Sequence, residues 1–200
     1  MSAVGSDEEG GVDLRMHPER YSAAQRRTAD AALELFAERG VGGTSLQMIA
    51  DSVGVTKAAI YHQFKTKEAI VLAVAEVELR RLEAALDIAE QAPNSLEARE
   101  SLLSQVIDIS VERRRAVMTL QNDPFLVRLL GEHEPFAHLM VRLFSVLVGG
   151  ESGDSARVRA AVISAAIGGA VAHPFVADLD DDTLRAELLA VTRRLILLPG

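Results

Sequence analysis

The chain has 200 residues, 48% of them hydrophobic, so it is long enough to bury a sizeable core in one domain or two small ones. It contains no cysteine, which excludes a disulfide framework and thiolate chemistry. No stretch approaches the roughly 20 apolar residues that would cross a bilayer, and the polar, acidic N-terminus does not resemble a secretory signal. We therefore expect a cytoplasmic protein that has no membrane partner.

The formal net charge of −8 is unevenly distributed along the chain. Residues 1–14 contain four acids and no base, whereas residues 15–70 contain eight Lys or Arg and six Asp or Glu. All three lysines, Lys57, Lys65 and Lys67, lie in that second segment. Because attraction to phosphate acts locally, this distribution matters more than the total charge, and it permits nucleic-acid binding by residues 15–70.

The N-terminal region combines a tail and a helix. Residues 1–16 are rich in Gly, Asp and Glu, which predicts a flexible acidic tail. A helix is predicted from Ser22 to Arg39, with Ala32, Leu35 and Phe36 on its buried face and glycines after its end.

Residues 44–67 predict two short helices joined by a tight turn. Thr44 or Ser45 can cap the first helix, because a side-chain hydroxyl accepts a bond from an otherwise unpaired N–H group. Gly54 supplies the positive φ angle that ends this helix, and Thr56 can cap the next one.

The second short helix has a buried face and an outward face. Ile60 and Phe64, four residues apart, are predicted to return to the core. The outward face offers a cation, a small side chain, a phenol and an imidazole, from Lys57, Ala58, Tyr61 and His62. Such a set suits a helix laid in the major groove of DNA.

The rest of the chain predicts further helices and no strand. Proline at the first helical position favours two short helices that begin near Pro124 and Pro135. The predicted fold is all-α with about nine helices: a three-helix head containing the helix-turn-helix over residues 17–66, and a helical ligand-binding and dimerisation domain over residues 67–200. The helices after the head are expected at residues 67–89, 95–118, 124–130, 135–148, 154–173 and 180–198.

Two stretches resemble a known family. G-V-T-K-A-A-I-Y-H-Q-F-K-T-K-E, residues 54–68, resembles the helix-turn-helix signature of TetR-family transcriptional regulators, and A-A-L-E-L-F-A-E-R-G, residues 31–40, resembles that family's first helix. Ala58 stands where the family often has glycine. Thr28 stands where an aliphatic residue is usual, which predicts looser packing at the start of the first helix. The resemblance implies DNA contacts from Thr44, Thr56, Lys57, Ala58, Tyr61, His62 and Lys67.

The last two predicted helices indicate a homodimer. Residues 158–172 are almost wholly small or apolar, and small side chains let helix axes approach closely. The resemblance implies a four-helix interface formed by the last two helices of each subunit, although burial inside one subunit would give the same pattern. The expected interface residues are Val162, Ala165, Gly169, Leu184, Leu188, Val191 and Leu195.

The resemblance also implies a ligand pocket among the middle helices. Apolar side chains and a few polar groups could line it, although Met and Phe at helical spacing are more often ordinary core. The candidates are Met118, Asn122, Phe125, Leu129, His138, Met140, Phe144, His173 and Phe175.

No catalytic set or metal site is predicted. His133 and His138 lie five residues apart, off a shared helix face, and no third ligand is evident. We therefore expect a non-enzymatic protein that needs no cofactor.

The resemblance implies a DNA-binding regulator that recognises a double-stranded, palindromic operator, most simply a repressor relieved by a small apolar effector. The alternative is a DNA-anchored adaptor whose C-terminal domain docks another protein without an effector.

Overall fold

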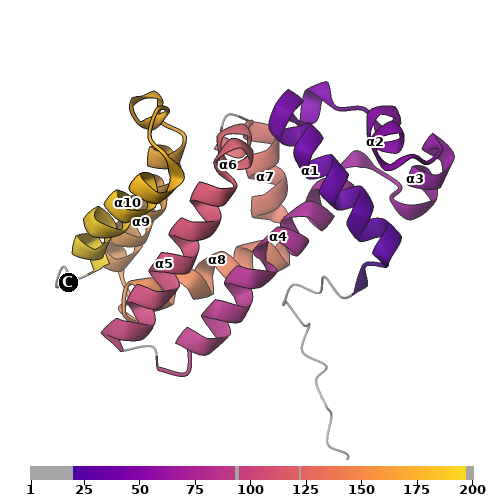
Figure 1. Ribbon diagram of the computed structural model, residues 1–200. Helices are drawn as coiled ribbons and strands as arrows, with labels where there is room; N and C mark the ends of the chain where they lie inside the picture. Colours follow the sequence, from indigo (N-terminus) through magenta and orange to yellow (C-terminus); the bar gives the residue numbers. More distant parts are fainter. Residues whose placement is uncertain (1–19, 93–94, 122, 197–200) are drawn as a thin grey trace, which may run out of the picture.

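The computed structural model describes residues 20–92, 95–121 and 123–196, which form ten α-helices and no strand (Figure 1). The all-α prediction is confirmed for these residues. The tail expected at residues 1–16 lies outside them. The helices are α1 (Ala23–Gly43), α2 (Leu46–Val53), α3 (Lys57–Gln63), α4 (Lys67–Ala89), α5 (Leu96–Glu112), α6 (Arg114–Gln121), α7 (Pro124–Glu132), α8 (Glu134–Leu147), α9 (Asp154–Val171) and α10 (Asp181–Ile196), with a short 3-10 helix η2 (Pro174–Val176) between the last two.

One expected helix is two. The stretch predicted as a single helix over residues 95–118 breaks at Arg113, which ends α5 with φ −111° and ψ 23°. After the break, α6 packs against α1 and α9. The break therefore places α6 between the N-terminal helices and the C-terminal pair.

Local hydrogen bonds explain where the helices of the N-terminal head begin and end. Ser22 caps α1 in a reciprocal capping box with Gln25, and Ser45, rather than Thr44, caps α2 by accepting from the Met48 N–H. Gly54 ends α2 in the left-handed conformation at φ 77°, as its position predicted. Thr56 then caps α3.

The core of the head extends beyond the first three helices. Ile60 of α3 and Phe64 after it are buried with Phe36 of α1, but Val71 of α4 and Leu126 of α7 belong to the same apolar cluster. The head and the rest of the molecule, here called the body, therefore share α4 and meet at α7. The boundary expected at residue 66 marks the start of α4, not the edge of the core.

The body packs α4, α5, α8, α9 and α10 around a second apolar cluster. Figure 1 shows α9 and α10 on the side of the molecule opposite the head. No helix among the described residues is long and apolar enough to span a membrane.

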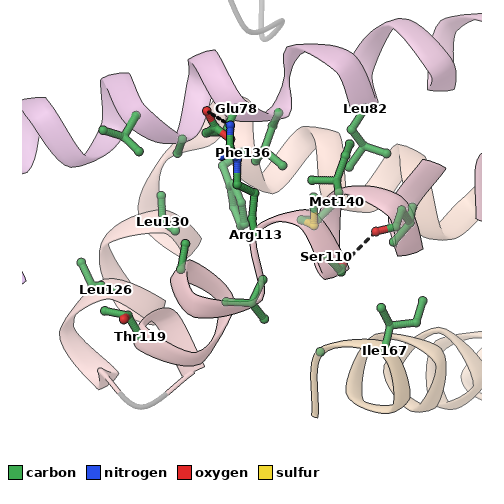
Figure 2. Close-up of a pocket in the computed structure, with 18 of the residues that line it drawn as sticks. Glu78, Leu82, Ser110, Arg113, Thr119, Leu126, Leu130, Phe136, Met140 and Ile167 are labelled. Carbon is green, nitrogen blue, oxygen red and sulfur yellow. Dashed lines mark hydrogen bonds and ion pairs between the residues drawn. The ribbon is translucent and has the colours of Figure 1, made fainter. Parts of the chain in front are cut away.

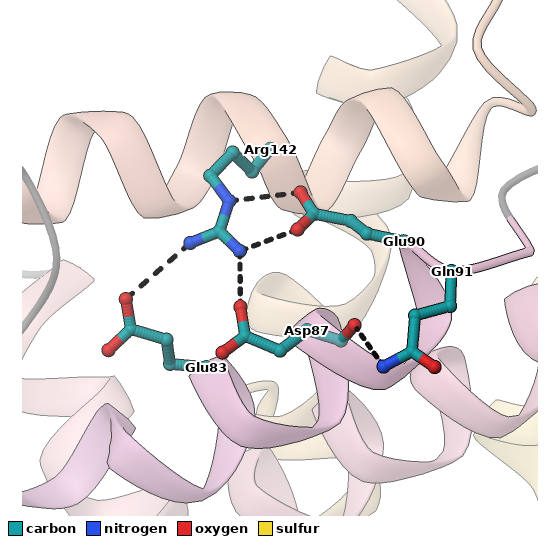
Figure 3. A network of polar contacts seen from close by, with 5 residues as sticks. All are labelled: Glu83, Asp87, Glu90, Gln91 and Arg142. Atoms are coloured by element: carbon teal, nitrogen blue, oxygen red, sulfur yellow. Dashed lines mark hydrogen bonds and ion pairs between the residues drawn. The ribbon is translucent and has the colours of Figure 1, made fainter.

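An arginine links α4 to α8 at the end far from the head (Figure 3). The Arg142 guanidinium donates to Glu90 at 2.6 and 2.9 Å and to Asp87 at 2.6 Å, and it lies 3.5 Å from Glu83. Hydrogen bonds to Glu90 chiefly, and to Asp87, raise the pKa of Arg142 above its ordinary value. This cation thus neutralises part of a dense acidic stretch of α4.

We expect Arg142→Ala to lower the free energy of unfolding by about 2 kcal/mol, because it leaves the buried Glu83 carboxylate without this cation. The figure is below the usual cost of breaking a buried pair, since Asp87 and Glu90 are partly exposed and screened. Urea unfolding followed by circular dichroism measures the change. A loss as small as that of the exposed-pair variant Arg81→Ala would contradict the assignment.

Candidate nucleic-acid interface and internal cavity

The outward face of α3 is a solvent-exposed surface of the head. Lys57, Ala58, Tyr61 and His62 are all exposed, and Tyr61 presents 51% of its surface. Thr56 is exposed at the N-terminus of the helix, where its hydroxyl accepts from the Ala59 N–H at 3.2 Å. These five predicted DNA-contacting residues therefore share one accessible surface, and their contact with DNA stays a prediction.

A polar contact that the sequence pattern missed holds α3 against α1. Thr28 is fully buried; its hydroxyl donates to the Ala24 carbonyl at 3.1 Å and to the Gln63 side-chain oxygen at 3.0 Å. The Gln25 amide donates to the Gln63 carbonyl at 3.2 Å. The looser packing predicted from Thr28 is therefore wrong, because its hydroxyl fixes the end of α3.

Thr44 and Lys67 serve the inside of the head rather than its outer surface. Thr44 is 2% exposed, and its hydroxyl donates to the carbonyls of Leu35 and Gly40, so its burial contradicts the DNA contact expected of this side chain. Gly40 has φ 71° and kinks α1, which brings these carbonyls to Thr44. The half-buried Lys67 ammonium donates to the carbonyls of Val41 and Thr44, and its contact with DNA stays a prediction.

A cavity of about 370 Å³, partly open to solvent, lies between the head and the body (Figure 2). Side chains from α1 and from α4 to α9 surround it, and most of them are aliphatic or aromatic. Its volume and lining are those of a small-molecule site, which is typically apolar with a few placed polar groups. Its lining includes Glu78, Ser110, Arg113, Leu130, Phe136, Met140 and Phe144.

Few polar groups reach the cavity. Glu78 of α4 and Arg113, at the break between α5 and α6, form an ion pair with a shortest distance of 2.5 Å. The Ser110 hydroxyl donates to the Val106 carbonyl at 2.7 Å, within its own helix. The cavity can therefore hold an apolar molecule and offer it one or two polar contacts.

Most of the predicted pocket residues lie elsewhere. Met140 and Phe144 line the cavity as expected, whereas Leu129 and His138 do not, and Leu129 packs against the core of the head. Met118 and Phe125 are each 41% exposed, and Phe175 is 88% exposed with its ring against the exposed His173. Asn122 lies outside the described residues. The expected pocket was wrong for the other six: Leu129 packs against another cluster, four of them are exposed, and the half-buried His138 lies outside the lining.

Helices α9 and α10 carry an exposed apolar face. Val162 is 47% exposed and Val191 54%, and Ala165 and Gly169 are exposed between small neighbours. An added Cβ at Gly169 would meet nothing within 4 Å, so its own chain does not fill the space beside it. This face is available to a second copy of the chain.

The other three expected interface residues, all on α10, are not exposed. Leu184 and Leu188 are 2% and 8% exposed and belong to the body's own core, so their assignment to a dimer interface was wrong. Leu195 is half-buried and packs against the same core. The 3/4 spacing in α10 therefore reports the core-facing side of that helix.

Comparisons with known proteins show which class of protein parts of this chain resemble. Residues 29–74 match the sequence profile of the bacterial regulatory proteins of the TetR family. The chain is 36% identical over 95 residues to the regulator AcrR of Shigella flexneri, covering 46% of this chain and 44% of AcrR. It is 46% identical over 48 residues to the repressor KstR2 of Rhodococcus jostii, covering 23% and 24%. The TetC protein of transposon Tn10 from Escherichia coli is 25% identical over 103 residues, 52% of each chain, so the alignments span about half of the first matched relatives or less.

Solved structures show the same arrangement of helices. FadR of Bacillus subtilis, solved in complex with stearoyl-CoA, has a TM-score of 0.67 at 20% identity, covering 88% of this chain and 99% of FadR. A transcriptional regulator from Aquifex aeolicus has a TM-score of 0.65 at 18% identity, covering 86% and 99%. The profile match over residues 29–74 and the exposed face of α3 define a helix-turn-helix domain. Residues 29–74 therefore match the TetR family, and the described chain shares the fold of the solved regulators.

Proposed function

We propose that the protein is a homodimeric repressor that binds a palindromic DNA operator and is released from it by a small apolar effector in the cavity. The observation that carries the proposal is the combination, in one chain, of an exposed face on α3 and an apolar cavity whose wall includes α4. Because α4 also belongs to the core of the head, filling the cavity acts on the helix that supports α3.

The exposed face of α9 and α10 supports the homodimer. Two copies joined there would carry two reading helices, and successive major grooves on one side of DNA lie about 34 Å apart. An effector that favours a different separation of the heads would weaken operator binding by its differential affinity for the two states.

The cavity supports an effector-controlled regulator over an adaptor. A concave space lined almost wholly by apolar side chains suits a small molecule, whereas docking another protein needs an extended outer surface. The stearoyl-CoA complex of FadR shows that a protein of this fold holds a ligand with a long apolar chain. Because the CoA part of that ligand is polyanionic, the likeness that we use extends only to its apolar chain. We infer an apolar effector, without a metal or a highly charged metabolite.

We expect Lys57→Ala to weaken operator binding by about 1–3 kcal/mol, or about 5- to 150-fold, because it removes an exposed cation from the reading face. Tyr61→Phe, which removes only a hydroxyl, should weaken it less. The operator is first selected from random duplexes with the wild-type protein, and affinities then follow from gel-shift titrations.

The matched control is Arg80→Ala, which removes an exposed cation from α4, outside the reading face. It should leave the affinity within about twofold of wild type, since rim charges away from the contact contribute little. If no sequence is enriched in the selection, the proposed function is wrong. If Lys57→Ala and Arg80→Ala behave alike, the reading face lies elsewhere.

A further inference from the structure

Glu76 of α4 is a fully buried carboxylate where three segments of the chain meet. Its Oε1 accepts a hydrogen bond from Arg20, just before α1, at 2.5 Å, and lies 3.0 Å from Nε2 of His133, between α7 and α8. Its Oε2 is buried and has no hydrogen-bond partner in the described part of the chain. One oxygen atom thus links the head, α4 and the body.

Stability alone is a poor explanation for this arrangement. Removing a carboxylate from water is costly even when it is paired, and apolar side chains of similar volume often stabilise such a site as well or better. The unpartnered Oε2 adds to that cost. What Glu76 provides, and an apolar side chain would not, is a directional contact to Arg20 and His133 together.

The His133 side of the contact belongs to the cavity wall. Leu130 and Phe136, three residues before and after His133, both line the cavity, and Figure 2 shows them on the α7 and α8 side of it. The His133 backbone N–H donates to the Leu130 carbonyl, and the His133 carbonyl accepts from the Ala137 N–H. A molecule that pushes this wall outward therefore moves the imidazole with it.

The Arg20 side of the contact leads to the reading helix. The Arg20 guanidinium lies 5.2 Å from the centre of the Tyr21 ring and donates to the Tyr21 hydroxyl at 3.2 Å. The Tyr21 ring lies 6.2 Å from the ring of Phe64, which caps the end of α3. Burial, the largest cause, raises the pKa of Tyr21 above its ordinary value.

We propose that the contact of Glu76 with Arg20 and His133 couples the occupancy of the cavity to the orientation of the head. In this structure Glu76 contacts both partners and so links the head to the body. A ligand that displaces the α7–α8 turn draws His133 away from Glu76, so the two states differ in the contact that orients α1 and α3. This inference rests on the proposed function, since it names the regulatory link of that same site.

The test measures the distance between head and body directly. The chain has no cysteine, so Gln47→Cys on α2 and Glu97→Cys on α5, both exposed, give two unique sites for spin labels. Labelled protein is diluted with unlabelled protein so that distances within one chain dominate, and pulsed electron spin resonance gives their distribution. Nile red, a neutral apolar dye whose fluorescence reports entry, serves as the cavity probe.

We expect Arg20→Ala and His133→Ala each to broaden the distance distribution without dye and to reduce the shift that Nile red causes to less than half of the wild-type shift. His133→Gln, which keeps a hydrogen-bond donor at this position, should restore much of the wild-type distribution. Arg81→Ala is the matched control, because it removes an α4 arginine paired at 2.8 Å with Glu112 of α5, away from the head.

Two features keep the outcome decisive. The Arg20 side chain is 52% exposed, so Arg20→Ala leaves the core intact even if a His133 variant unfolds, and thermal unfolding checks each variant. The distance measurement contains no DNA. A failure of the operator selection would therefore refute the proposed function without changing what the distance measurement says about the Glu76 contact. If Arg20→Ala folds and its dye-free distribution matches that of wild type, the proposal is overturned.

Discussion

Gly169→Arg is expected to convert the protein from dimer to monomer and to lower operator affinity by about 10²–10⁴, the gain that linking two binding modules typically provides. The substitution places a long cation in the middle of the exposed apolar face of α9, between Ala165 and the start of η2. Its own chain accommodates it, since a Cβ at this position meets nothing within 4 Å. Arginine also favours a helix more than glycine does, so the fold should not weaken.

Sedimentation velocity and an operator titration on the same preparation measure both effects. Gly131→Arg is the matched control, because Gly131 is also exposed in a helix, α7, and an added Cβ there also meets nothing within 4 Å. It should remain dimeric. If Gly169→Arg remains dimeric as well, the α9 face is not the interface, and the proposed dimer is wrong.

The parts of the fold that the sequence predicted are those decided by short-range chemistry. Gly54 ends α2 and Thr56 caps α3 through hydrogen bonds that span at most four residues. Ile60 and Phe64 were recognisable as core because their spacing is that of one helix face. Such features need no knowledge of the distant chain.

The cavity was harder to predict because long-range packing decides which side of each helix faces it. The break at Arg113 sends α6 in a new direction, and Met118 becomes exposed instead of lining the cavity. Phe175 was expected to line the pocket because its side chain is aromatic, yet it is 88% exposed in η2. A large apolar side chain favours burial, but its residue type does not say where it is buried. On α9 and α10 of this chain, several apolar side chains lie on the outer surface of the subunit.

The buried polar groups were missed for a related reason. A glutamate on a helix surface ordinarily faces solvent, and nothing near Glu76 in the sequence marks it as buried. Its partners Arg20 and His133 lie 56 and 57 residues away. Thr28 was read by comparison with aliphatic residues, whereas its hydroxyl bonds Gln63, 35 residues away. In both cases the tertiary fold supplies the partner.

Ser110→Phe is expected to abolish the response to apolar compounds while operator binding stays near its wild-type value. Ser110 lines the cavity from α5, so the substitution fills the space with an aromatic ring. The hydrogen bond that it removes is the one that the Ser110 hydroxyl donates to the Val106 carbonyl within the same helix. Over-packing could cost about 1–3 kcal/mol of stability, and thermal unfolding of the unliganded variant measures that cost. The reading face on α3 is untouched.

Thermal-shift screening with the wild-type protein comes first, because a ligand that binds only the folded state raises the melting temperature. We expect lipophilic compounds to raise it, and divalent metals or polyanionic metabolites to leave it unchanged, since burying an unpaired charge among these apolar side chains is unfavourable. Ser110→Phe should remove the shift, whereas Ser101→Phe, at an exposed position of the same helix, should retain it. A compound qualifies as the effector only if it also releases the operator from the wild-type protein. Strong shifts from metals or polyanions alone, or an undiminished lipophile response in Ser110→Phe, would show that the effector binds outside this cavity.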